Sequence, residues 1–211
     1  MERCGWGARR IVRRIRPVLV IASVLVAAAC ATAPRASAPP AARLLSAVTP
    51  LPSGCGVGST CAPASASGVA MAALPVGFGA AGAAATDRLD DDDVMITRTW
   101  QVSKPTFLNP GGQPMGASIT VQVTNHPSED ERDALGLDTN PRPPSPVQIG
   151  ARSAYSSTWT VSTVALDGTT PVQLQAASIY VALSDTVRVQ VNTIGLSAEL
   201  TQLLAAAVVV Q

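Results

Sequence analysis

The sequence has few aromatic residues: three Trp, two Tyr and two Phe make up 3% of 211 residues, although 47% of the residues are hydrophobic. A core built from this chain must be filled mainly by Ala, Val, Leu and Ile. Lys occurs once, at Lys104, and His occurs once, at His126. The formal net charge is only +1. This composition excludes a collagen, a coiled coil, a multi-pass membrane protein and a strongly basic nucleic-acid-binding protein.

The small net charge is the sum of segments with different character. Residues 1–30 contain six Arg and one acidic residue, whereas residues 87–211 contain seven basic and thirteen acidic residues. The C-terminal part is therefore acidic. We expect no nucleic-acid partner, because affinity for a phosphate backbone depends largely on Lys and Arg. The length predicts one folded domain with appended segments.

Residues 1–29 have the pattern of a secretory signal peptide. Five arginines between Arg9 and Arg16 precede an uncharged apolar run from Val18 to Ala29, and this order of a basic and an apolar region directs a chain to export. The apolar run is shorter than the roughly 20 residues that a membrane-spanning helix needs. We expect the arginines to stay in the cytoplasm and the rest of the chain to be exported.

The end of the apolar run and the Cys that follows it resemble the lipobox of bacterial lipoproteins, in which small residues precede a Cys. The motif here is Ala27-Ala28-Ala29-Cys30. The resemblance covers only the signal region, and it implies that Cys30 receives a diacylglyceryl group and anchors the mature chain to a membrane. Two alternatives stay open: ordinary cleavage at Ala31-Thr32-Ala33 with free secretion, and an uncleaved anchor helix.

Residues 30–86 are predicted to be a disordered tether. Ala, Pro, Gly and Ser occupy 38 of the 56 positions in 31–86, and no hydrophobic period persists. Such a segment buries too little apolar area to offset the entropy lost on ordering. The folded domain is therefore expected to span 87–211.

Two cysteines lie within this tether, in the sequence Cys55-Gly-Val-Gly-Ser-Thr-Cys61. In an exported protein, two closely spaced Cys predict a structural disulfide. A metal site would need further soft ligands, and a redox motif would need the tighter Cys-x-x-Cys spacing. We expect no metal and no cofactor.

From Val94 onward the hydrophobic pattern alternates with a period of two. β-branched residues alternate with polar ones, which predicts half-buried antiparallel strands. The alternating segments are 94–102, 119–124, 158–164, 172–183 and 187–192. Turn residues at 109–112, 167–168 and 184–185 separate strands, and the prolines of 141–146 exclude a central strand there. The fold class predicted is mainly β, an antiparallel sandwich or a small barrel.

Two helices are expected. Ser128–Glu131 matches a capping box that would open a short helix ending at Gly136. At the C-terminus, apolar residues fall at helical spacing after Ser197, which is the predicted N-cap. We expect an amphipathic helix over residues 197–210 that packs on the β core. Its apolar positions are Leu196, Leu200, Leu203, Leu204 and Ala207.

Residues that could carry chemistry are few. His126 has no nucleophile motif to work with, so a polar loop residue is the expected role. Asp87 and Asp90–Asp93 could attract calcium, but no calcium-binding loop follows; a solvated run before the first strand is favoured. The acidic run Glu129–Asp133 is expected to be solvated likewise. Trp100 and Trp159 are expected to pack in the core rather than stack on a sugar.

These features predict an exported, lipid-anchored envelope protein that is not an enzyme. It would bind or scaffold an unknown protein partner through strand-edge pairing or an apolar groove. One alternative is a carrier that holds an apolar ligand in a small barrel, and a more remote one is a hydrolase using His126. The expected location is the exported side of the cell envelope, with secretion as the alternative.

Overall fold

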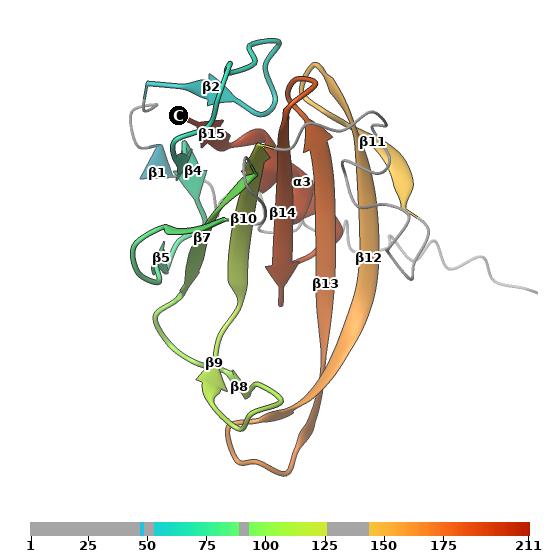
Figure 1. The fold of residues 1–211 in the computed structure, drawn as a ribbon. Helices are drawn as coiled ribbons and strands as arrows, with labels where there is room; N and C mark the ends of the chain where they lie inside the picture. Colours follow the sequence, from blue (N-terminus) through green and yellow to red (C-terminus); the bar gives the residue numbers. More distant parts are fainter. Residues whose placement is uncertain (1–46, 49–52, 89–92, 126–143) are drawn as a thin grey trace, which may run out of the picture. The chain divides into compact units, whose positions relative to one another are not determined.

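The computed structural model describes residues 47–48, 53–88, 93–125 and 144–211 (Figure 1). All of these belong to the second of the chain's two units, which spans Ala38–Gln211. The expected signal peptide, Cys30 and the helix expected at 128–136 lie outside the described residues.

The described residues form a mainly β domain around one large antiparallel sheet that curls into a half-barrel. This confirms the predicted fold class. The strands follow the order β5-β7-β10-β14-β13-β12-β8-β9, while β6 also pairs with β7 and β11 also pairs with β12. Their bounds are β5 Phe78–Ala80, β6 Ala85–Arg88, β7 Val94–Val102, β8 Phe107–Leu108, β9 Pro114–Met115, β10 Ser118–Asn125, β11 Ser145–Ile149, β12 Arg152–Ala165, β13 Pro171–Ala182 and β14 Val187–Ile194.

The three predicted turns are confirmed, and each is closed by a polar side chain or a backbone hydrogen bond. Between β8 and β9, the Asn109 carbonyl accepts from the Gly112 amide at 2.8 Å. Between β12 and β13, the Asp167 carboxylate accepts from the Thr170 amide at 2.8 Å. Between β13 and β14, the Ser184 hydroxyl accepts from the Val187 amide at 3.1 Å. Local side-chain acceptors of this kind are why these residues favour turns.

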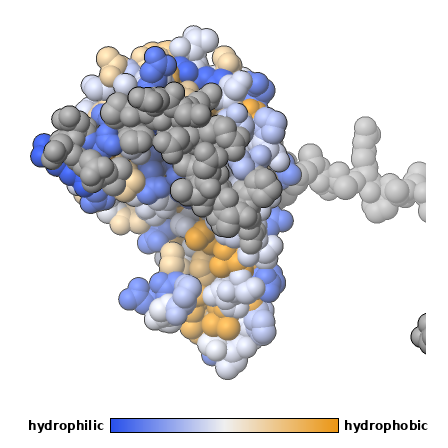
Figure 2. All heavy atoms as spheres, turned by 45° about the vertical axis from the view of Figure 1, so that its right-hand side comes forward, coloured by the Kyte–Doolittle hydropathy of each residue, from blue (hydrophilic) through white to orange (hydrophobic). Residues whose placement is uncertain are grey.

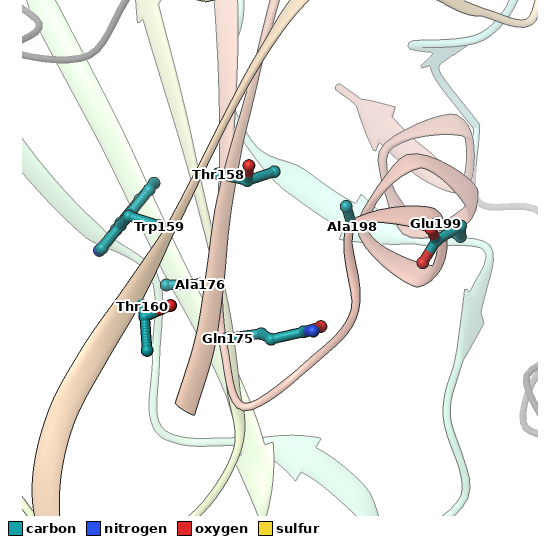
Figure 3. Close-up of a pocket in the computed structure, with 7 residues that line it drawn as sticks. All are labelled: Thr158, Trp159, Thr160, Gln175, Ala176, Ala198 and Glu199. Carbon is teal, nitrogen blue, oxygen red and sulfur yellow. The ribbon is translucent and has the colours of Figure 1, made fainter. Parts of the chain in front are cut away.

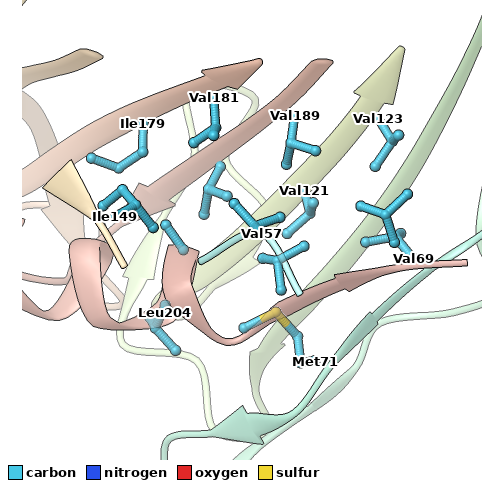
Figure 4. Packing of buried hydrophobic residues seen from close by; sticks show 14 of the residues in the cluster. Val57, Val69, Met71, Val121, Val123, Ile149, Ile179, Val181, Val189 and Leu204 are labelled. Atoms are coloured by element: carbon cyan, nitrogen blue, oxygen red, sulfur yellow. The ribbon is translucent and has the colours of Figure 1, made fainter. Parts of the chain in front are cut away.

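The alternating pattern places one face of the sheet in the hydrophobic core. Val121 pairs with Val191, and Val191 pairs on its other side with Ile179, so all three lie on the same face. Together with their neighbours they form one buried cluster with α3 (Ala198–Ala206). We call this side of the sheet the α3 face. Figure 4 shows the cluster, with Val121, Ile179 and Val189 from the large sheet and Leu204 from the helix.

Helix α3 confirms the predicted C-terminal helix and its N-cap. The Ser197 hydroxyl accepts from the Leu200 amide at 3.2 Å. Leu200 and Leu204 are buried, but Leu203 is 45% exposed, so the expectation that Leu203 packs on the core is wrong. One residue corresponds to about 100° of helix rotation, and this places Leu203 on the outer side of α3. No helix among the described residues is both long and apolar enough to cross a bilayer.

The last three valines of the chain form a strand. The expectation that the C-terminal helix continues to Val210 is therefore wrong. β15 (Val208–Val210) lies between β2 (Cys55–Gly56) and β3 (Val69–Met71) in a second, three-stranded sheet. All three valines are buried. A β-branched run favours a strand once neighbouring strands are available to pair with it.

The described residues of the predicted tether include members of the folded core. The predicted start of the domain at residue 87 is therefore wrong for this part of the chain. Val57, Val69 and Met71 belong to the same core cluster as the large sheet. A further short pairing joins β1 (Ala47–Val48) to β4 (Ala73–Leu74). The strands β1 to β4 are only two or three residues long. They are too short for a hydrophobic period to predict them from the sequence.

The predicted disulfide is present. Cys55 and Cys61 are bonded, with their Cα atoms 5.4 Å apart. The ring that they close begins in β2 and contains Val57.

Candidate functional site

Most of the charged residues singled out in the sequence lie outside the described residues: His126, Asp90–Asp92 and the acidic run Glu129–Asp133. Asp87 is exposed on β6. Asp93 is buried, so the interpretation of this run as solvated is wrong at Asp93. Among the residues that the structure describes, no group of three or more His, Cys, Asp or Glu side chains is placed to hold a metal ion.

The two predicted core tryptophans have different surroundings. Trp100 on β7 is buried as predicted, and the Arg98 guanidinium lies over its ring at 5.3 Å, within cation–π range. Arg98 also donates from Nη1 to the Val69 carbonyl at 3.0 Å, which ties β7 to β3. Trp159 on β12 is only half-buried, so the expectation of full core packing is wrong for this residue.

A pocket of about 450 Å³ lies where β12 and β13 meet the start of α3 (Figure 3). Thr160 and Gln175 are register partners on the two strands. Figure 3 shows Gln175 directed toward the start of α3, whereas Trp159 points to the other side of β12. The lining residues are Thr158, Trp159, Thr160, Gln175, Ala176, Ala198 and Glu199.

Glu199 is the one charged residue in this lining. The pKa of its carboxyl is lowered, first by a hydrogen bond from its own backbone amide and then by one from the Ser197 side chain. The carboxylate is therefore ionised at neutral pH. With the Thr158 and Thr160 hydroxyls and the Gln175 amide beside this carboxylate, the pocket can hydrogen-bond a small polar molecule.

The side of the sheet opposite the α3 face carries a row of polar side chains that bond to each other. Ser178 donates to Asn192 Oδ1, and Gln190 donates to the same oxygen at 2.9 Å. Asn192 donates in turn to Gln122 Oε1 at 3.4 Å. These groups come from β13, β14 and β10, and they satisfy one another's hydrogen bonds. The row therefore stabilises the sheet and is a poor candidate for ligand binding.

The same face becomes apolar toward the β12–β13 turn. Val161 and Leu174 are register partners, and Val172 lies two residues from Leu174 on the same side. All three are half-buried, in contrast to the fully buried valines of the α3 face. We call these three residues the apolar sheet patch. Figure 2 shows a hydrophobic area in the lower part of the molecule, the part that holds the β8–β9 hairpin and the β12–β13 turn.

Neither the pocket nor the apolar sheet patch was predicted from the sequence. The alternation of 158–164 and 172–176 indicated two faces, but it did not indicate which face would be left outside the core. Since α3 begins beside Gln175 only in the folded chain, no local signal marks the pocket. No known protein family, curated protein or solved structure matches this chain.

Proposed function

We propose that this protein is a non-enzymatic binding module of the cell envelope, held to a membrane through lipid on Cys30. It would bind its partner, a protein with an apolar surface, on the apolar sheet patch. The observation that carries the binding role is that Val161, Val172 and Leu174 are only half-buried, on the face away from α3.

The physical argument concerns the use of apolar side chains. The large core cluster with α3 does not include Val161, Val172 or Leu174, so the patch is not part of that core. Burying apolar area gains roughly 25 cal/mol per Å², and these three side chains each keep part of their surface open to solvent. A partner that covers the patch would gain this free energy.

Two observations support export. The arginine-rich start, the apolar run and Cys30 follow in the order found in lipoprotein signals. The Cys55–Cys61 disulfide fits an oxidising compartment, since disulfides are rare in a reducing cytosol. Secretion without lipid is the alternative.

The anchor is tested by Cys30→Ser, with radiolabelled fatty acid and membrane fractionation as readouts. The variant should lose the label and move to the soluble fraction. An unchanged membrane fraction would contradict lipid anchoring and would favour an uncleaved anchor helix.

The binding surface is tested with a photocrosslinking residue placed in cells at Leu174 or at Gln173. These neighbours lie on opposite faces of β13, so Gln173 is a matched control. We expect a discrete crosslinked product from position 174 and none from position 173. Equal products from both positions, or none from 174, would contradict a partner on the apolar sheet patch.

The pocket beside α3 gives no support to an apolar-ligand carrier, because its lining side chains are mainly polar. A hydrolase would depend on His126, which lies outside the described residues. Neither alternative gains a specific observation.

A further inference from the structure

The ring closed by Cys55 and Cys61 holds together parts of the domain that are far apart in the sequence. Val57 lies inside the ring, is 0% exposed and belongs to the core cluster. Its amide donates to the Val208 carbonyl at 2.8 Å, next to the pairing of β2 with β15. The ring therefore places one apolar side chain in the core and attaches it to the C-terminal strand.

The next residue of the ring contacts the turn between β11 and β12. The Gly58 carbonyl accepts from the Ala151 amide at 2.9 Å. Gly150 approaches so closely that a Cβ atom there would lie 2.0 Å from the Gly58 carbonyl oxygen. Contact at this distance requires glycine.

The end of the ring contacts the turn between β13 and β14 through Arg152. Its guanidinium donates from Nη2 to the Cys61 carbonyl at 2.5 Å and from Nη1 to the Leu183 carbonyl at 3.1 Å. The ring thus joins β15, the β11–β12 turn and the β13–β14 turn.

We infer that this ring is a redox-sensitive clasp. When oxidised it keeps Val57 in the core and β2 on β15; when reduced it releases both, while the large sheet and α3 stay folded. The inference does not depend on the proposed partner site. Its reductant is a dithiol of the thiol–disulfide oxidoreductase class.

Reduction would proceed through the more accessible half of the bond, because Cys61 is exposed and Cys55 is half-buried. A thiolate of the reductant attacks Cys61 Sγ, the bond between the two cysteines breaks, and Cys55 leaves as a thiolate that takes up a proton. The second thiolate of the reductant then attacks the reductant sulfur of this mixed disulfide, and Cys61 is released as a thiol. Two electrons pass to the protein, and the dithiol becomes a disulfide.

We expect reduction to open only the region around the ring. The ring contributes one side chain to the core cluster, and most other members of the cluster come from the large sheet. In the loop-entropy model, a ring of this size favours the closed state by about fifty-fold. Amide protons held by the clasp should therefore exchange with solvent about fifty-fold faster after reduction. Amides at the centre of the large sheet should change by less than about twofold.

The test is residue-resolved hydrogen exchange on the full chain, oxidised and reduced with dithiothreitol. We expect the Val57 and Ala151 amides to accelerate and the Val191 amide on β14 to stay protected. Unchanged exchange at Val57 would show that the ring holds nothing in place and would overturn the clasp. Loss of protection at Val191 as well would also overturn the clasp, because the disulfide would then stabilise the whole domain and not the ring region alone.

Two variants keep the result interpretable. Cys55→Ser combined with Cys61→Ser removes the ring without a reductant and should reproduce the reduced pattern in buffer alone. Val57→Ala keeps the bond and removes the buried side chain, so its Ala151 amide should stay protected. If Val57→Ala alone exposes Ala151 as fully as reduction does, side-chain burial rather than the disulfide holds the turn, and the redox role is refuted.

Discussion

Replacing Leu204 by Ala is expected to destabilise the domain by roughly 2–5 kcal/mol, whereas replacing Leu203 by Ala should cost less than about 1 kcal/mol. The two leucines are neighbours in the last turn of α3, so both substitutions change the intrinsic helix propensity by a similar amount. Their surroundings differ: Leu204 is 0% exposed within the core cluster, and Leu203 is 45% exposed. The pair therefore isolates the free energy of packing.

The magnitude at Leu204 has two parts. Removing the buried side-chain carbons loses their transfer free energy, and the surrounding residues relax only partly, which leaves a cavity. At Leu203 nearly half of the residue is already in contact with solvent, and the space left by truncation is open to water. The larger part of the penalty is therefore expected only at Leu204.

The assay is chemical and thermal unfolding of both variants beside the parent. For a domain of this size, about 2–4 °C of Tm corresponds to 1 kcal/mol, so Leu204→Ala should lower Tm by roughly 5–15 °C and Leu203→Ala by only a few degrees. Equal losses, or a larger loss for Leu203→Ala, would refute the orientation of α3 on the sheet.

Three further predictions concern the small sheet, one turn and one close contact. Deleting residues 208–211 removes the central strand of the β2–β15–β3 sheet, so limited proteolysis should cut the deletion variant within 53–74 and leave this region of the parent intact. The pKa of Asp167 is lowered from 3.8 to about 2, first by the Thr170 hydroxyl and then by nearby backbone amides. Its stabilising contribution is therefore present above about pH 4 and lost as the pH falls toward 2, and Tm should decline more steeply over this range in the parent than in Asp167→Asn. Gly150→Ala should lower Tm by several degrees more than Gly112→Ala, because both glycines have positive φ but only the Cβ at 150 would collide with a neighbour; equal shifts would show that backbone strain alone is responsible.

The strands of the large sheet were predictable because their signal is local. In β14, for example, buried Val187, Val189 and Val191 stand two residues apart, and this spacing is visible without a structure. The turns were equally local, since Asp167 and Ser184 accept hydrogen bonds from amides only a few residues away. The same holds for the Ser197 cap of α3.

The errors fall where the stabilising contact comes from a distant part of the chain. Val57 and Val69 lie in a segment rich in small residues, and nothing nearby distinguishes them from isolated apolar residues of a tether. They are buried because residues about 140 to 150 positions later supply the adjacent strand: Val69 pairs with Val210, and the Val57 amide donates to the Val208 carbonyl. The expectation that Leu203 is buried is wrong for a related reason. Helical spacing places several leucines on one side of the helix, but it does not indicate how far around the helix the core extends.

By itself, then, the sequence determined the alternating strands, their turns and the capped helix, and it singled out Cys55 and Cys61 as a bonded pair. It also carries the export signal pattern, which is a linear feature and needs no fold. Only the tertiary structure decided which face of the sheet α3 covers and where the domain begins. A strand of two or three residues such as β2 or β15 has too few residues to show a period, and it is stable only after another segment has provided its hydrogen-bonding partner.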